Sequence, residues 1–152
     1  TGSIISNYEH AFEVMPVLVS FIPMLMDTGG NCGSQSSTLI IRGLAIDEIK
    51  FSDFFKVVFK EFRISIVVGI MLGIANGIRI VLLNHDVYLA FVVSASIVVT
   101  VMISKFVGCV LPIVAKRLKM DPAIMAAPLI TTIVDTLAIM VYFSIASQIF
   151  NL

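Results

Sequence analysis

Three long apolar segments restrict this sequence to very few kinds of fold. They cover residues 64–83, 87–115 and 123–150, and each can cross a bilayer core of about 30 Å, which takes ~20 apolar residues in a helix. A fourth segment, residues 14–41, is long enough but contains a polar, glycine-rich run from Asp27 to Thr38. Hydrophobic residues make up 59% of the 152 residues, more apolar surface than a soluble core of this size can bury. The sequence therefore predicts an all-α, polytopic membrane helix bundle of about four transmembrane helices, forming one domain over residues 1–152.

The segment 51–62 has a different pattern, in which apolar residues recur at helical spacing and charged residues lie off that stripe. The apolar residues are Phe51, Phe54, Phe55, Val58, Phe59 and Phe62. This pattern predicts a short amphipathic helix at the membrane interface. The alternative is a gating or partner-binding element.

The basic residues predict the orientation in the membrane. Eight of the ten Lys and Arg residues lie in the loops 42–63 and 116–121, which the positive-inside rule makes cytoplasmic, with the chain's start and end outside. The net charge of zero gives no electrostatic reason to expect a nucleic-acid partner. No signal peptide is predicted, because no basic n-region follows Thr1-Gly2-Ser3.

Several small or isolated residues are not expected to form a catalytic or metal site. Gly69, Gly73 and Gly77 form a ridge that favours close packing of another helix. Cys32 and Cys109 are expected to be buried free thiols, since no metal-ligand spacing accompanies them, and His10 and His85 are isolated.

Asp135 is the residue most suggestive of function, because it lies inside the last apolar segment. A carboxylate at the centre of a membrane helix costs roughly 2.5–3.5 kcal/mol and normally faces protein or water. Thr131 and Thr132 precede it by one turn, and Pro128 is expected to free a carbonyl near Ile124 that could face a cavity. The alternative is a structural ion pair between Asp135 and Lys105.

The polar run in the first segment supplies a second candidate surface. Asp27, Asn31, Gln35 (or Ser34) and Thr38 recur at close to helical spacing, and the glycines between them permit irregular backbone that exposes carbonyl oxygens. Such a stripe is expected to line a pore, the alternative being hydrogen bonds between helices. All the available ligands are hard oxygens, which suit Mg²⁺, Mn²⁺ or Ca²⁺.

These two regions together resemble the MgtE family of magnesium channels. Residues 21–38, with Ile41-Arg42-Gly43-Leu44-Ala45, are similar to the family's second membrane helix, and Leu118–Asp135 is similar to its last. The resemblance implies a homodimer in a bacterial inner membrane, with the ion path on the two-fold axis and a largely hydrated Mg²⁺ held at Asp135. The family has one more membrane helix than the four predicted here, and its cytosolic regulatory domains are absent from this chain.

The resulting hypothesis is a non-enzymatic, Mg²⁺-selective channel domain with passive uptake driven by the membrane potential. Its alternatives are a proton- or Na⁺-coupled divalent carrier and a non-transporting membrane scaffold. Candidate metal-binding residues are Asp135, Asn31, Gly30, Thr132 and Thr131; candidate pore-lining residues are Asp27, Gln35, Ser34, Thr38, Gly29, Gly33 and Pro128.

Overall fold

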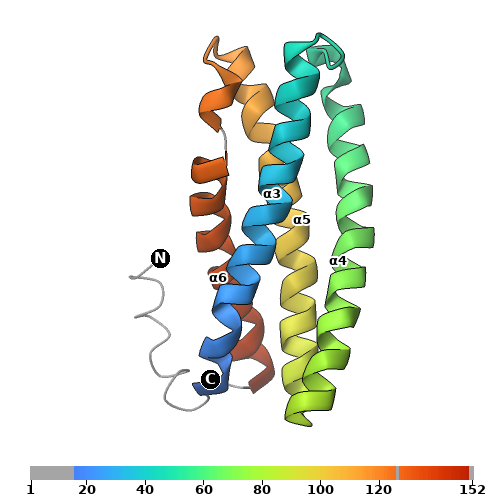
Figure 1. Cartoon of the computed structure of the whole chain (residues 1–152), viewed down its shortest axis with the longest axis vertical. Coiled ribbons are helices and arrows are strands. Elements are labelled where there is room, and N and C mark those ends of the chain that lie inside the picture. The colour runs from blue at the N-terminus through green and yellow to red at the C-terminus, as the bar shows by residue number, and fades with distance from the viewer. Residues whose placement is uncertain (1–15, 126, 151–152) are drawn as a thin grey trace.

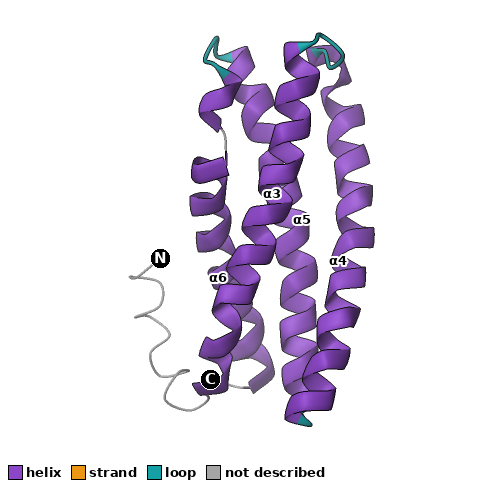
Figure 2. Cartoon of the chain, in the orientation of Figure 1, coloured by secondary structure: helices purple, strands orange, loops and turns teal. Residues whose placement is uncertain are grey.

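The computed structural model describes residues 16–125 and 127–150, and its regular elements in this part of the chain are all helices (Figures 1 and 2). The predicted all-α class is confirmed. The long helices are α3 (Ile22–Ala45), α4 (Phe54–Asn84), α5 (Val87–Arg117) and α6 (Ala127–Phe150), and the short 3-10 helices are η1 (Pro16–Phe21), η2 (Phe51–Asp53) and η3 (Pro122–Met125). His10, the first residues of the predicted segment 14–41 and the chain end predicted to lie outside fall beyond the described residues.

Helix α5 is the centre of the bundle and packs against α3, α4 and α6. It begins after Asp86, whose carboxylate accepts a hydrogen bond from the Leu89 N–H at 3.0 Å and so caps the helix. Its buried residues form a core with α3 and α6, in which Tyr142 and Phe143 are the largest fully buried side chains. The observed bounds of α5 are close to the predicted segment 87–115.

Three helices in the described part are long and apolar enough to cross a membrane: α4, α5 and residues 128–150 of α6. Helix α3, expected as a further crossing, has 24 residues and a length of about 36 Å at 1.5 Å per residue. It lies alongside the others (Figure 1). Because of its polar run, α3 is less apolar than those three helices and is not among them. A helix of this composition needs protein or water beside its polar face.

The predicted interfacial helix is not a separate element. Residues 54–62 form the first part of α4, which continues without a break into the apolar segment. No glycine or proline interrupts the sequence between Phe62 and Ile64, so nothing ends the helix there. The amphipathic character is retained, because Phe54 packs on a cluster around Ile40 and Cys109 while Phe55 is 82% exposed.

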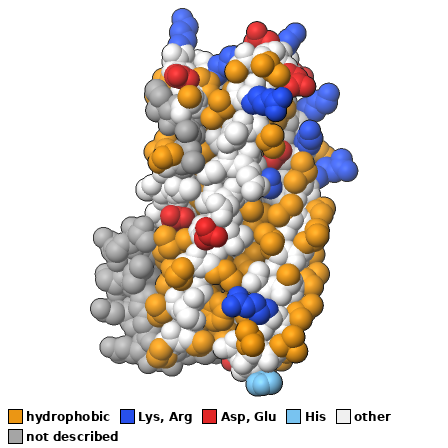
Figure 3. All heavy atoms as spheres, viewed as in Figure 1, with side chains coloured by type: hydrophobic (Ala, Val, Ile, Leu, Met, Phe, Trp, Pro, Cys, Tyr) orange, Lys and Arg blue, Asp and Glu red, His pale blue; other side chains and the backbone are white. Residues whose placement is uncertain are grey.

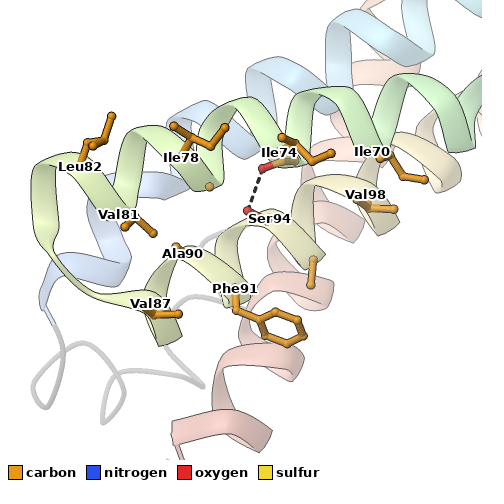
Figure 4. Close-up of a pocket in the computed structure, with 13 residues that line it drawn as sticks. Ile70, Ile74, Ile78, Val81, Leu82, Val87, Ala90, Phe91, Ser94 and Val98 are labelled. Atoms are coloured by element: carbon orange, nitrogen blue, oxygen red, sulfur yellow. Dashed lines mark hydrogen bonds between the residues drawn. The ribbon is translucent and has the colours of Figure 1, made fainter.

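The glycine ridge of α4 packs on α5, as the small-residue pattern predicts. A Cβ added at Gly69 or Gly73 would lie 3.2 Å from backbone atoms of Val98 or Ser94, and one at Gly77 would meet the Ser94 hydroxyl. That hydroxyl donates to the Gly73 carbonyl at 2.8 Å, the bond drawn as a dashed line in Figure 4. Apolar side chains of both helices line the groove beside this contact, which has a volume of about 640 Å³.

The two basic loops lie at the same end of the bundle. The Lys116 ammonium, at the end of α5, donates to the Leu44 carbonyl at 2.6 Å and lies 3.7 Å from the Asp47 carboxylate in the loop after α3. Figure 3 shows most of the Lys and Arg side chains gathered toward this end. This arrangement agrees with the positive-inside argument, and the orientation itself stays a prediction.

Candidate functional site

Helix α3 is continuous through the polar run from Asp27 to Thr38. The predicted irregular backbone is therefore wrong: no glycine in the described residues has a positive φ. The glycines serve the packing of a regular helix instead, because they allow other helices to approach its backbone.

Gly29 and Gly33, predicted to line a pore, lie on the buried face of α3. A Cβ at Gly29 would come within 2.8 Å of both Thr100 on α5 and Val134 on α6. A Cβ at Gly108 on α5 would overlap the Gly33 carbonyl oxygen. The two helices thus approach backbone to backbone, and neither Gly29 nor Gly33 lines a hollow described below.

The opposite face of α3 carries polar side chains that are exposed in the single chain: Asp27, Asn31, Gln35 and Thr38. Against this face, α3 and α6 enclose an open hollow of about 200 Å³. We call it the acidic hollow; its residues are Met26, Asp27, Gly30, Asn31, Thr131 and Asp135. Figure 3 shows acidic side chains at mid-height over α3 and α6. Five of the predicted site residues therefore lie together, from two segments about 100 positions apart in the sequence.

Gly30 allows α6 to lie close to α3 at the acidic hollow. A Cβ there would be 3.0 Å from the Thr131 Cγ2 and 3.7 Å from the Asp135 Oδ1. On the α3 side, the Asn31 amide donates to the Asp27 carboxylate at 3.0 Å, which orients both groups. Asp135 is half-buried, so its carboxylate is held by the bundle while remaining accessible from the hollow.

A second hollow, of about 460 Å³, continues along α3 from the first. We call it the amide hollow; it is lined by Asn31, Ser34, Gln35, Thr38 and Leu39. Asn31 belongs to both hollows, so the polar surface is continuous from Asp27 to Thr38. The Ser34 hydroxyl oxygen is buried and has no hydrogen-bond partner among the described residues.

Pro128 and Thr132 do not line either hollow. Pro128 is the second residue of α6, where a missing N–H costs no helical hydrogen bond, so it does not free a carbonyl inside a helix as predicted. Its own carbonyl accepts hydrogen bonds from the Thr131 and Thr132 hydroxyls, at 3.1 and 2.8 Å. The predicted helix 123–150 correspondingly begins at Ala127, after η3.

Lys105 has a partner other than Asp135. Its ammonium lies 3.4 Å from the Glu61 carboxylate, with both side chains 8% exposed, and it donates to the Ser36 hydroxyl at 3.1 Å. The structural alternative for Asp135, an ion pair with Lys105, is therefore wrong. Sequence reasoning missed Glu61, because it placed this residue in the interfacial segment 51–62, outside the predicted transmembrane helices.

The acidic hollow offers oxygen atoms as ligands for a metal ion, from two carboxylates, an amide and a hydroxyl. No group of three or more His, Cys, Asp or Glu residues that could hold a metal ion occurs among the described residues. Such a sparse set of hard ligands suits Mg²⁺, which releases its water reluctantly and commonly binds through one or two carboxylates with several waters kept.

Comparisons with known proteins agree with this chemistry. Residues 22–145 match the family model MgtE, described as a divalent cation transporter. The chain is 38% identical over 147 residues to the magnesium transporter MgtE of Bacillus subtilis, covering 97% of the chain and 33% of that protein. It is 35% identical over 146 residues to the magnesium transporter MgtE of Thermus thermophilus, covering 96% of the chain and 32% of the relative. The chain thus spans about a third of the length of these relatives.

Proposed function

Because this chain belongs to the MgtE family of divalent cation transporters, we propose that it forms the pore of a magnesium channel in which a hydrated Mg²⁺ is held at Asp135. The family is one of transporters rather than enzymes, and with its apolar helices the chain is a multi-pass membrane protein. The observation that carries the proposal is the acidic hollow, which Asp27 of α3 and Asp135 of α6 both line. Asp135 has no cationic partner in the described part of the chain.

The pore is formed by two copies of the chain in this proposal. Asp27, Asn31, Gln35 and Thr38 are exposed on a single chain, and lipid cannot satisfy the hydrogen bonds of such a surface. Two-fold symmetry is the commonest arrangement of homo-oligomers, and it would bring two polar faces of α3 together. Two Asp135 carboxylates would then face one hydrated divalent ion.

The membrane potential alone is sufficient to drive passive entry of the ion. A charge of +2 gains about 2 × 2.3 kcal/mol per 100 mV of inside-negative potential. With the basic loops in the cytoplasm of a bacterium and this domain in its inner membrane, Asp27 lies toward the outer side of Asp135 and concentrates cations ahead of it. Mn²⁺ and Ca²⁺ satisfy the same oxygen chemistry and are tested as competitors.

Flux into liposomes tests this proposal. The purified protein is reconstituted into vesicles that contain a Mg²⁺-sensitive dye, and a potassium gradient with valinomycin sets an inside-negative potential. We expect Mg²⁺ entry to increase with the potential. It should continue when a protonophore removes the proton driving force and when Na⁺ is left out. Entry that requires a proton or Na⁺ gradient would favour a coupled carrier, and no entry above protein-free vesicles would favour a scaffold.

Gly30 provides a prediction about the width of the acidic hollow. A Cβ at this position lies 3.0 Å from Thr131, so Gly30→Ala must displace Thr131, and Gly30→Val must also place a methyl group beside Asp135. We expect the maximal Mg²⁺ flux to fall severalfold in Gly30→Ala and further in Gly30→Val. Gly69→Ala is the matched control, because it introduces a similarly close contact between α4 and α5, away from the acidic hollow. Equal flux in Gly30→Val and the wild type would contradict this role for Gly30.

A further inference from the structure

We propose that Ser36, Glu61 and Lys105 form a polar clamp that sets the axial and rotational position of α3, and thereby the position of its polar face relative to Asp135. These three are positioning residues, which act on the ion through α3. The inference rests on the proposed channel function and adds to it a residue set that lies outside both hollows.

The polar clamp joins three helices through buried groups. Ser36 of α3 donates to the Glu61 carboxylate of α4 at 2.7 Å. Lys105 of α5 donates to the Ser36 hydroxyl at 3.1 Å and lies 3.4 Å from the same Glu61 oxygen. Ser36, Glu61 and Lys105 are all buried. Each of the three side chains therefore contacts the other two.

The other contacts of α3 are of different kinds: apolar core residues near both of its ends, and the hydrogen bond from the Lys116 ammonium to the Leu44 carbonyl. Next to the clamp, α3 meets α5 through Gly33 and Gly108, a contact between two backbones without interlocking side chains. Apolar contacts in a bilayer are weakly directional, because lipid is as apolar as the helix partner. Hydrogen bonds and ion pairs between buried groups are directional, and their loss leaves a charge without a partner.

The position of Ser36 makes it suitable for this task. It follows directly after Gln35, which lines the amide hollow about 100° around α3 from it. A residue on a helix turns by about 100° and rises by about 1.5 Å per position, so any rotation or slip of α3 moves Ser36 and Gln35 together. With Ser36 held by Glu61 and Lys105, Gln35 and Asn31 keep their direction toward the pore.

Two replacements separate positioning from simple stabilisation. Glu61→Leu with Lys105→Met removes both charges and keeps similar volumes, a change that leaves stability nearly unaltered in many buried ion pairs. Ser36→Ala removes only the tie to α3 and leaves Glu61 and Lys105 paired. Ser65→Ala is the matched control for Ser36→Ala, because Ser65 is also fully buried but its hydroxyl bonds to the Phe62 carbonyl of its own helix.

The measurements are the half-saturating Mg²⁺ concentration, the preference for Mg²⁺ over Mn²⁺ and the thermal unfolding temperature of each reconstituted or detergent-solubilised variant. Ser36→Ala removes the two hydrogen bonds that tie α3 to Glu61 and Lys105. We expect it to raise the half-saturating concentration by about 2- to 10-fold, while it unfolds at a temperature close to that of Ser65→Ala. The double variant is expected to lose Mg²⁺ preference to at least the same extent.

Wild-type half-saturation and ion preference in Ser36→Ala overturn the inference, whether or not the double variant folds. The same holds if both variants merely unfold earlier and transport normally below that temperature. These outcomes differ from failure of the proposed function, in which the wild-type protein itself conducts no Mg²⁺.

Discussion

Replacing Asp135 with asparagine is expected to raise the half-saturating Mg²⁺ concentration by about 10- to 100-fold, the range of a hydrogen bond to a charged group. In a two-fold pore both carboxylates disappear at once, so growth that depends on Mg²⁺ uptake should fail. Asparagine keeps the shape of the side chain, and Asp135 makes no ion pair in the described residues that the change would break. Rescue of a bacterial strain without its own magnesium transporters, together with liposome flux, measures the effect.

Asp47→Asn provides the matched control for Asp135→Asn. It removes the same charge from an exposed loop, where the residue has a φ of 55° that asparagine adopts readily. Its carboxylate is 88% exposed and 3.7 Å from Lys116, so we expect wild-type rescue. Full rescue by Asp135→Asn would remove Asp135 from the ion path, and Asp27 would then be the remaining carboxylate of the acidic hollow.

The long apolar helices were predictable because a bilayer imposes their length. Residues 87–115 carry no glycine or proline signal strong enough to end a helix, and α5 indeed passes through Pro112 to Arg117. The grouping of Asp27 and Asn31 on one face of α3 was also predictable, since four-residue spacing places side chains one above the other. The first result follows from the thickness of the bilayer, and the second follows from the periodicity of the helix.

The roles of individual glycines were not predictable from this periodicity. Gly29, Gly30 and Gly33 lie within four positions, yet Gly30 lines the acidic hollow while Gly29 and Gly33 face α5 and α6. A glycine-rich run permits both an irregular backbone and a close helix contact. Only the position of α5, which places Gly108 opposite Gly33, decides between the two.

The partner of Lys105 was missed for a related reason. Asp135 and Glu61 are both acids, and Lys105 is 30 and 44 positions away from them in the sequence. The choice depends on which helix lies beside the Lys105 face of α5, which is a matter of tertiary packing. The structure resolves it in favour of Glu61 at 3.4 Å, and this leaves Asp135 free for the ion in the proposed function.

The contact between Gly33 and Gly108 yields the largest expected effect on stability. Gly108→Ala would place a methyl group onto the Gly33 carbonyl oxygen and 2.9 Å from the carbonyl carbon. No side-chain rotation relieves a clash between a Cβ and a backbone, so α3 and α5 must separate. We expect a loss of about 3 kcal/mol, at the upper end of the cost of overpacking, measured as a lower unfolding temperature in detergent.

Gly69→Ala isolates the steric part of that loss. Both substitutions replace a helical glycine with alanine, which by itself favours a helix by about 1 kcal/mol. At Gly69 the nearest backbone atom would lie 3.2 Å away, so a small shift suffices and the protein should be nearly as stable as the wild type. If Gly108→Ala unfolds at the same temperature as Gly69→Ala, the backbones of α3 and α5 are farther apart than described. A marked difference supports the close contact that holds α3 against α5 and, one turn further along α3, brings Ser36 to Lys105.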